Sequence, residues 1–155
     1  MITAVDTNVL LDLLIPGAPH GDESEQALAE ALGAGALVVS EPVYAELAGH
    51  FPDPGDLDRF LDHGGIRLLP SSADALHRAG RAWRDYRTRR PALLVCAQCG
   101  HAQDVRCGQC NGPIRPRQHV VADFMIGAHA LVHADRLLTR DRGYYATYFP
   151  ELVVG

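Results

Sequence analysis

The sequence lacks both a hydrophobic run of membrane-spanning length and any lysine. Its apolar start, residues 1–14, is interrupted by Asp6 and Asp12, and no basic residue precedes it, which excludes a secretory signal peptide. A transmembrane helix is excluded too, because it needs about 20 consecutive apolar residues. We therefore expect a soluble, cytoplasmic protein with no membrane partner.

Because lysine is absent, all 14 basic residues are arginine. A genome that favours arginine codons explains this most simply, although arginine also binds phosphate through two parallel hydrogen bonds. Residues 1–75 contain 13 acidic and 2 basic residues, a net charge of −11, whereas residues 76–155 contain 6 acidic and 12 basic residues, a net charge of +6. This asymmetry indicates nucleic acid or another charged partner; compositional drift of exposed helices is the alternative.

Short apolar strands alternate with helices, which predicts an α/β fold with a parallel sheet and helices on both faces. The 155 residues, 47% of them hydrophobic, fit one compact domain. We expect strands at residues 2–5, 36–40, 66–69, 136–139 and 151–154, and helices at 7–14, 22–32, 56–63, 72–90 and 120–133, with another opened by Pro42. Ligand sites in such sheets lie at the carboxyl ends of the strands.

Four carboxylates lie where predicted strands end or helices begin. Asp6 and Asp141 follow strands, Asp123 starts a helix, and Glu46 lies in the first turns of another. Carboxylates that converge repel one another, and a hard divalent cation such as Mg²⁺ or Mn²⁺ relieves this. Such a pocket commonly acts on phosphate esters. Taken singly, each residue has another explanation as a helix cap, a turn former or a solvated helix residue. Asp12 lies off the predicted pocket face.

The four cysteines form two CxxC pairs seven residues apart, at Cys96, Cys99, Cys107 and Cys110. This spacing predicts one tetrahedral Zn²⁺ held by four thiolates, a structural site with no open ligand position. We expect residues 92–117 to be an inserted zinc ribbon that folds only with its metal. Residues 1–91 and 118–155 then form one domain, into which the ribbon is inserted. The ribbon is either a rigid staple, the simpler interpretation, or an RNA-contacting knuckle that uses Arg106, Arg115 and Arg117.

Four sequence strings occur in a characteristic order: VDTNVLLDLL, SEPVYAELAGH, VVADFMIGAHALVHA and LLTRDRGYY. Together they resemble the PIN domain, and more closely the bacterial VapC-type toxin ribonucleases. The resemblance covers residues 1–91 and 118–155, and the last two strings are the most specific. It implies a PIN-like three-layer sandwich with a central, mostly parallel sheet, to which the small zinc ribbon is added.

The resemblance also implies the functional residues. Asp6, Glu46, Asp123 and Asp141 match the acidic quartet that holds Mg²⁺ or Mn²⁺ and carries catalysis, while Thr7, Asn8 and Thr139 match positions that orient ligands. It implies a metal-dependent endoribonuclease that leaves 5′-phosphate ends, forms a homodimer and is inhibited by a small antitoxin. Two alternatives stay open: a PIN-type endonuclease of rRNA maturation, since such members also carry zinc ribbons, and a non-catalytic zinc-ribbon RNA-binding module.

The predicted helix at residues 72–90 is rich in arginine and has an apolar stripe of Leu76, Ala79, Trp83 and Tyr86, which we expect to pack in the core rather than to stack on bases. Arg81 and Arg84 lie on its remaining surface, where they either contact RNA phosphates or form a solvated face. His129 and His133 are expected to pack in the core rather than bind metal. The aromatic residues 144, 145, 148 and 149 are expected to pack against the last strand.

Overall fold

Four parallel strands form the central sheet, in the order β3-β2-β1-β6. The structure is a computed structural model that describes residues 1–89, 93–95, 101–114 and 120–155. The strands span Ile2–Val5 (β1), Ala36–Val39 (β2), Ile66–Leu68 (β3) and Arg136–Leu138 (β6). Because all four run in the same direction, their carboxyl ends meet at one edge, as the sequence predicted.

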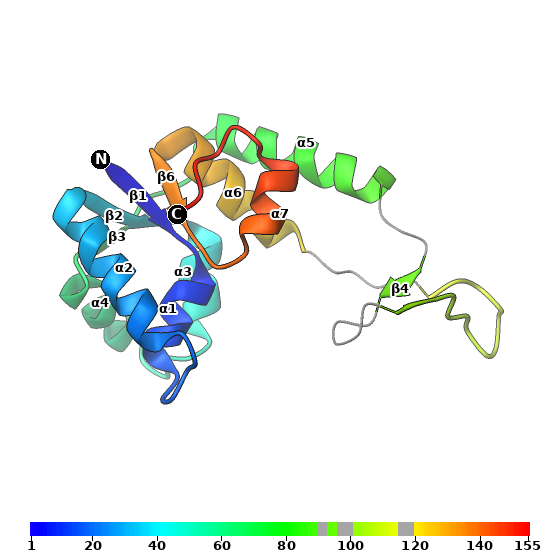
Figure 1. Ribbon diagram of the computed structural model, residues 1–155, viewed down its shortest axis with the longest axis horizontal. Helices are drawn as coiled ribbons and strands as arrows, with labels where there is room; N and C mark the ends of the chain where they lie inside the picture. The colour runs from blue at the N-terminus through cyan, green and yellow to red at the C-terminus, as the bar shows by residue number, and fades with distance from the viewer. Residues whose placement is uncertain (90–92, 96–100, 115–119) are drawn as a thin grey trace.

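Helices cover both sides of this sheet (Figure 1). They span Thr7–Leu14 (α1), Gly21–Ala34 (α2), Glu41–Ala48 (α3), Pro54–His63 (α4), Ala73–Arg89 (α5), Val121–His133 (α6) and Arg142–Tyr148 (α7). On one side α6 packs against β1 and β6 with α5 beside it, and on the other α2 contacts β2 and α4 contacts β3. The predicted α/β fold with a parallel central sheet is confirmed.

The apolar stripe of α5 is confirmed in part. Ala79 and Tyr86 are buried and Trp83 is partly buried, with the rings of Trp83 and Tyr86 each centred 5.5 Å from the ring of Phe124 on α6. Leu76, in contrast, is 45% exposed, so its predicted place in the core is wrong. The stripe holds α5 against α6, which keeps the start of α6 in a fixed position.

The C-terminal segment differs from the prediction. Residues 142–148 form a helix, α7, that the sequence did not predict, and the strand expected at 151–154 is reduced to one parallel bridge between Leu137 and Val154. Aromatic and β-branched residues have low helix propensity, which hid this helix. It forms because Asp141 caps it, accepting a hydrogen bond from the Tyr144 amide at 3.2 Å. Tyr144 and Tyr145 are therefore buried as residues of helix α7, and the strand against which they were expected to pack is reduced to that one bridge.

Part of the predicted insertion forms a small antiparallel pair, β4 (Leu94–Val95) with β5 (Ala102–Gln103), which lies apart from the main sheet in Figure 1. Cys96, Cys99, Arg115 and Arg117 lie outside the described residues. Within the described part of the chain, no helix is both long and apolar enough to cross a membrane.

His129 lies in the core on α6, 1% exposed, and neither ring nitrogen has a hydrogen-bond partner in the described part of the chain. Burial, reinforced by the neighbouring His133 ring at 5.0 Å, lowers the pKa of His129 to about 4. The folded protein therefore holds His129 neutral, whereas the unfolded chain protonates it below about pH 6.5. This histidine packs in the core, as expected, and makes stability depend on pH.

We expect acidification from pH 7 to pH 5 to cost about 2 kcal/mol of unfolding free energy through His129 alone, because only the unfolded state gains the proton. Stability is retained above pH 6.5 and is lost progressively as the pH falls towards 4. Urea denaturation at the two pH values measures the loss, and His129→Leu should remove most of it. The exposed His50→Gln should not. An unchanged pH dependence in His129→Leu would contradict this assignment.

Candidate active site

Asp6 lies at the carboxyl end of β1 and is only 6% exposed. It caps α1, since its Oδ1 accepts a hydrogen bond from the Thr7 amide at 2.8 Å. Its Oδ2 accepts three side-chain hydrogen bonds, from Asn8 Nδ2 at 2.8 Å, Thr139 Oγ1 at 2.6 Å and the Tyr145 hydroxyl at 3.3 Å. The carboxylate is therefore held in one orientation from both ends of the chain.

Burial raises the pKa of Asp6, and the nearby charge of Glu46 raises it further. Hydrogen bonds from Thr139, Thr7 and Tyr145 act in the opposite direction but do not cancel the effect of burial. A carboxylate in this environment gains from a neighbouring positive charge. The electrostatics of Asp6 therefore suit a cation.

Glu46 projects from α3 and is solvent-exposed. The Thr7 hydroxyl donates a hydrogen bond to Glu46 Oε2, and the Thr7 amide donates to Asp6. Thr7 thus donates one hydrogen bond to each of the two carboxylates, and the structure brings Asp6 and Glu46 together.

Asp123 and Asp141 lie at the starts of two helices. Asp123, in the first turn of α6, accepts a hydrogen bond from the Val120 amide at 2.9 Å. Asp141 caps α7, and its own amide donates to Thr139 Oγ1 at 3.1 Å, the oxygen that also donates to Asp6. The charges of Asp123 and Asp141 both raise the pKa of Tyr144, after the larger effect of its burial.

These four carboxylates gather at one edge of the sheet without forming a closed ligand set. In the described ranges, no three histidine, cysteine or acidic side chains are close enough to hold one metal ion. Mg²⁺ keeps several of its waters and binds through one or two carboxylates, so a partial set of oxygen ligands fits such an ion better than it fits Zn²⁺. The donor set, all oxygen, and the raised pKa of Asp6 agree with this choice.

The polar residues that accompany the quartet also reach Asp6. Asn8 Nδ2 contacts both Asp6 and, at 3.2 Å, Thr139 Oγ1, while its Oδ1 accepts from the Arg140 amide. Sequence reasoning missed Tyr145, because its contact with Asp6 depends on the unpredicted helix α7. The signal was the position of Tyr145, one turn after a residue able to cap a helix.

Asp12 contacts residues outside the quartet. It accepts a hydrogen bond from the Ser24 hydroxyl at 2.7 Å and forms an ion pair with Arg140 Nε at 3.0 Å. Arg140 also donates to the Asn8 carbonyl, which ties the segment after β6 to α1. Asp12 therefore ties α1 to α2 and to the segment after β6, and its absence from the quartet stays a prediction.

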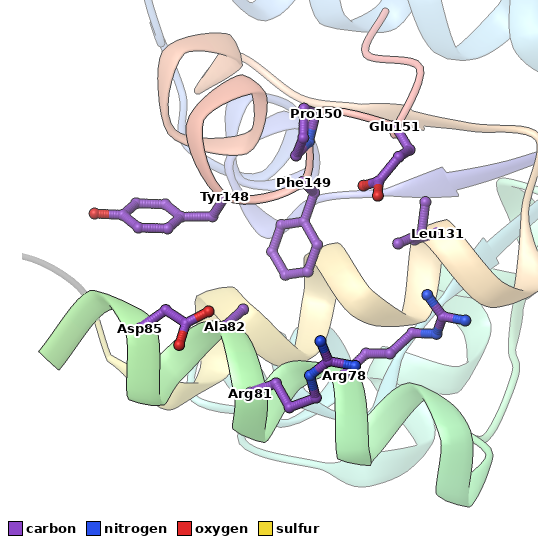
Figure 2. Close-up of a pocket in the computed structure, with 9 residues that line it drawn as sticks. All are labelled: Arg78, Arg81, Ala82, Asp85, Leu131, Tyr148, Phe149, Pro150 and Glu151. Carbon is purple, nitrogen blue, oxygen red and sulfur yellow. The ribbon is translucent and has the colours of Figure 1, made fainter. Parts of the chain in front are cut away.

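The arginines proposed to contact RNA have different surroundings. Figure 2 shows Arg78 and Arg81 extending from α5 towards residues 149–151, where they line a cavity of about 270 Å³ together with Asp85 and Glu151. Arg81 has no ion-pair partner within the described residues, whereas Arg84 is 3.9 Å from Asp85. The cavity carries both signs of charge, so it is not a purely basic surface.

Arg106, in the insertion, forms an ion pair with Asp104 at 3.0 Å and donates to the Asn111 carbonyl. Its guanidinium therefore supports the turn that carries the second cysteine pair. RNA contact by any of these arginines stays a prediction.

The second CxxC pair forms a tight turn. The Cys107 amide donates to the Gly112 carbonyl and the Asn111 amide to the Cys107 carbonyl, each at 2.9 Å. Asn111 adopts the left-handed conformation with φ of 55°, which asparagine tolerates better than most residues. Backbone amides of Cys110 and Gln109 lower the pKa of the Cys107 thiol, as suits a thiolate ligand. Since Cys96 and Cys99 lie outside the described residues, the four-cysteine site stays a prediction.

The PIN-domain family model matches residues 3–150, and the chain therefore belongs to the PIN-domain family. Its fold is similar to a chain in VapBC2 of Rickettsia felis bound to a promoter DNA fragment, with 17% identity, coverage of 100% of this chain and 98% of that one, and a TM-score of 0.60. The fold is also similar to a chain of VapBC-1 from nontypeable Haemophilus influenzae, with 19% identity, coverage of 100% of this chain and 97% of that one, and a TM-score of 0.61. For a chain of FitAcB from Neisseria gonorrhoeae the identity is 18%, the coverage is 99% of this chain and 96% of that one, and the TM-score is 0.61. No curated protein matches the sequence.

Proposed function

We propose that this PIN-domain protein is a metal-dependent endoribonuclease that hydrolyses RNA phosphodiester bonds, and that it is the toxin of a toxin–antitoxin pair. PIN domains are generally nucleases, which supports the hydrolase class. The observation that carries the proposal is the buried Asp6 carboxylate, held by four donors beside Glu46 at the edge where Asp123 and Asp141 also lie.

The four carboxylates and the polar residues around Asp6 have different roles in this proposal. Asp6, Glu46, Asp123 and Asp141 would hold Mg²⁺ or Mn²⁺, which when bound promotes attack of water on phosphorus and offsets the charge on the phosphate. Thr7, Asn8 and Thr139 keep Asp6 oriented. A carboxylate not held by the cation accepts the proton of the attacking water. The P–O3′ bond breaks, and the O3′ oxygen takes up a proton from solvent, which leaves a 5′-phosphate and a 3′-hydroxyl.

Incubation of the purified protein with total RNA tests this activity. We expect discrete fragments with 5′-phosphate ends in Mg²⁺ or Mn²⁺ and none with EDTA. A folded protein, free of any co-purified partner, that cleaves no RNA with either metal would contradict the proposal. Binding of RNA without turnover by the same protein would favour the zinc-ribbon RNA-binding module.

A small antitoxin is the proposed protein partner, and a homodimer is the proposed assembly. The similar structures include VapBC and FitAB complexes. An apolar cavity of about 400 Å³ lies between α2 and α4 and is lined by the exposed side chains of Leu13 and Leu32 together with Leu28, Phe60 and Ile66. It belongs to the half of the chain with a net charge of −11, so an arginine-bearing segment with an apolar face suits it.

An rRNA-maturation endonuclease is the second candidate, and the knuckle-like turn at Cys107 and Cys110 is the feature that favours it. Growth arrest on expression, relieved by a small protein encoded next to this gene, would favour the toxin. Accumulation of unprocessed rRNA in a deletion strain, with no such neighbour, would favour the processing enzyme.

We propose that Cys96, Cys99, Cys107 and Cys110 bind one structural Zn²⁺. Cys107→Ser is expected to reduce bound zinc from about one ion per chain to none, because the short insertion cannot hold the metal with three thiolates as tightly as with four. Metal analysis of the purified protein measures this, and an unchanged melting temperature of the main domain serves as the control for folding. Zinc retained at full stoichiometry in Cys107→Ser would contradict a four-thiolate site.

A further inference from the structure

The two carboxylate oxygens of Asp6 differ in their surroundings. Among the residues that the structure describes, three side chains donate hydrogen bonds to Oδ2, whereas Oδ1 accepts only one, from the Thr7 amide. A carboxylate has about four lone-pair positions in all, two on each oxygen. Oδ2 therefore has no free position, and Oδ1 retains one for another ligand.

Tyr145 is the donor to Oδ2 that comes from outside the predicted site residues. It is 2% exposed, and Asp6 is the one hydrogen-bond acceptor that its hydroxyl contacts within the described residues. The contact joins residues 139 positions apart and comes from α7, the helix that Asp141 caps. One short helix thus carries a predicted metal-holding carboxylate at its start and, one turn later, a donor to another.

Packing alone does not explain this hydroxyl. The ring of Tyr145 lies 4.8 Å from the ring of Tyr144 and 6.5 Å from that of Phe149, contacts that phenylalanine would also make. A buried hydroxyl costs free energy unless it is hydrogen-bonded, so a tyrosine here gains only through its bond to Asp6.

We infer that Tyr145 is a positioning residue: with Asn8 and Thr139, its hydroxyl holds Asp6 Oδ2 so that Oδ1 faces a divalent cation. The inference rests on the proposed metal-dependent function. It adds to that function a group that orients Asp6, one of the proposed metal ligands. Groups that orient a metal ligand in this way commonly change metal affinity by 10- to 100-fold when they are removed. Because the Tyr145 contact, at 3.3 Å, is the longest of the three, we expect the lower end of that range.

Titration of the purified protein with Mn²⁺, followed by calorimetry, tests the inference. Tyr145→Phe is expected to weaken Mn²⁺ binding about tenfold, with RNA cleavage restored at saturating Mn²⁺. Tyr44→Phe is the matched control, because the Tyr44 hydroxyl also donates to a carboxylate, Asp58 at 2.8 Å, but on the exposed surface. It should bind Mn²⁺ as the wild type does.

The outcomes separate the inference from the proposed function. If the wild type binds Mn²⁺ and cleaves RNA but Tyr145→Phe binds Mn²⁺ as tightly or more tightly, the positioning role is wrong and the function stands. If the wild type binds no Mn²⁺ and cleaves nothing, both are wrong. Should Tyr145→Phe be less stable, the rise of its melting temperature with Mn²⁺ concentration, compared with the wild type, still reports affinity.

Discussion

Asp6→Asn is expected to reduce RNA cleavage by at least about a hundredfold, since the substitution removes the buried carboxylate nearest the proposed cation. The fold should survive. Burial raises the pKa of Asp6, which means that the folded protein disfavours its charge, and a neutral isostere relieves that cost. The side-chain NH2 group of asparagine cannot accept a hydrogen bond as the oxygen it replaces does, which offsets this gain, so the melting temperature of Asp6→Asn should stay close to that of the wild type.

Asp62→Asn is the control for this substitution, since Asp62 is an exposed aspartate on α4. It should change neither cleavage nor stability. The test measures the cleavage rate of one RNA fragment and the melting temperature for the wild type, Asp6→Asn and Asp62→Asn. An Asp6→Asn protein that cleaves within tenfold of the wild-type rate would show that the reaction does not depend on this carboxylate.

Gly127→Ala is expected to lower the unfolding free energy by about 1–3 kcal/mol, although alanine is the better helix former by about 1 kcal/mol. A Cβ at Gly127 would lie 2.4 Å from Cε2 of the Phe149 ring, which is buried where the chain leaves α7. The ring must move for the methyl group to fit, and α7 carries Asp141 and Tyr145. The substitution should therefore also reduce activity.

Gly80→Ala is the matched control, in the middle of α5, where a Cβ would meet nothing within 4 Å. It should raise the unfolding free energy by about 0.5–1 kcal/mol, because it gains helix propensity without a clash. Urea denaturation measures both variants. Equal effects of the two substitutions would contradict the close packing of α6 against Phe149.

The sequence predicted the sheet and most helices because their signals are local. Apolar runs mark β1 and β2, and the Asp53 side chain accepts a hydrogen bond from the Gly55 amide at the start of α4. The positions of Asp6 and Glu46 could be predicted because parallel strands place their carboxyl ends at one edge. The ligand roles of all four carboxylates stay predictions.

The C-terminal segment could not be predicted in the same way. The aromatic run of α7 favours a strand by propensity, and tertiary packing decides otherwise. Tyr145 meets Asp6 from 139 residues away, a contact that no local pattern encodes. The exposure of Leu76 likewise depends on how α5 lies against α6, which the periodicity of one helix does not specify.

The central claim is that the carboxylates at this edge hold a catalytic cation. Anomalous diffraction from crystals soaked in Mn²⁺ tests it most directly. We predict a peak about 2.1 Å from Asp6 Oδ1, with Glu46, Asp123 and Asp141 turned towards the same ion or its waters. A protein that cleaves RNA with Mn²⁺ but shows no Mn²⁺ at Asp6 would contradict the account.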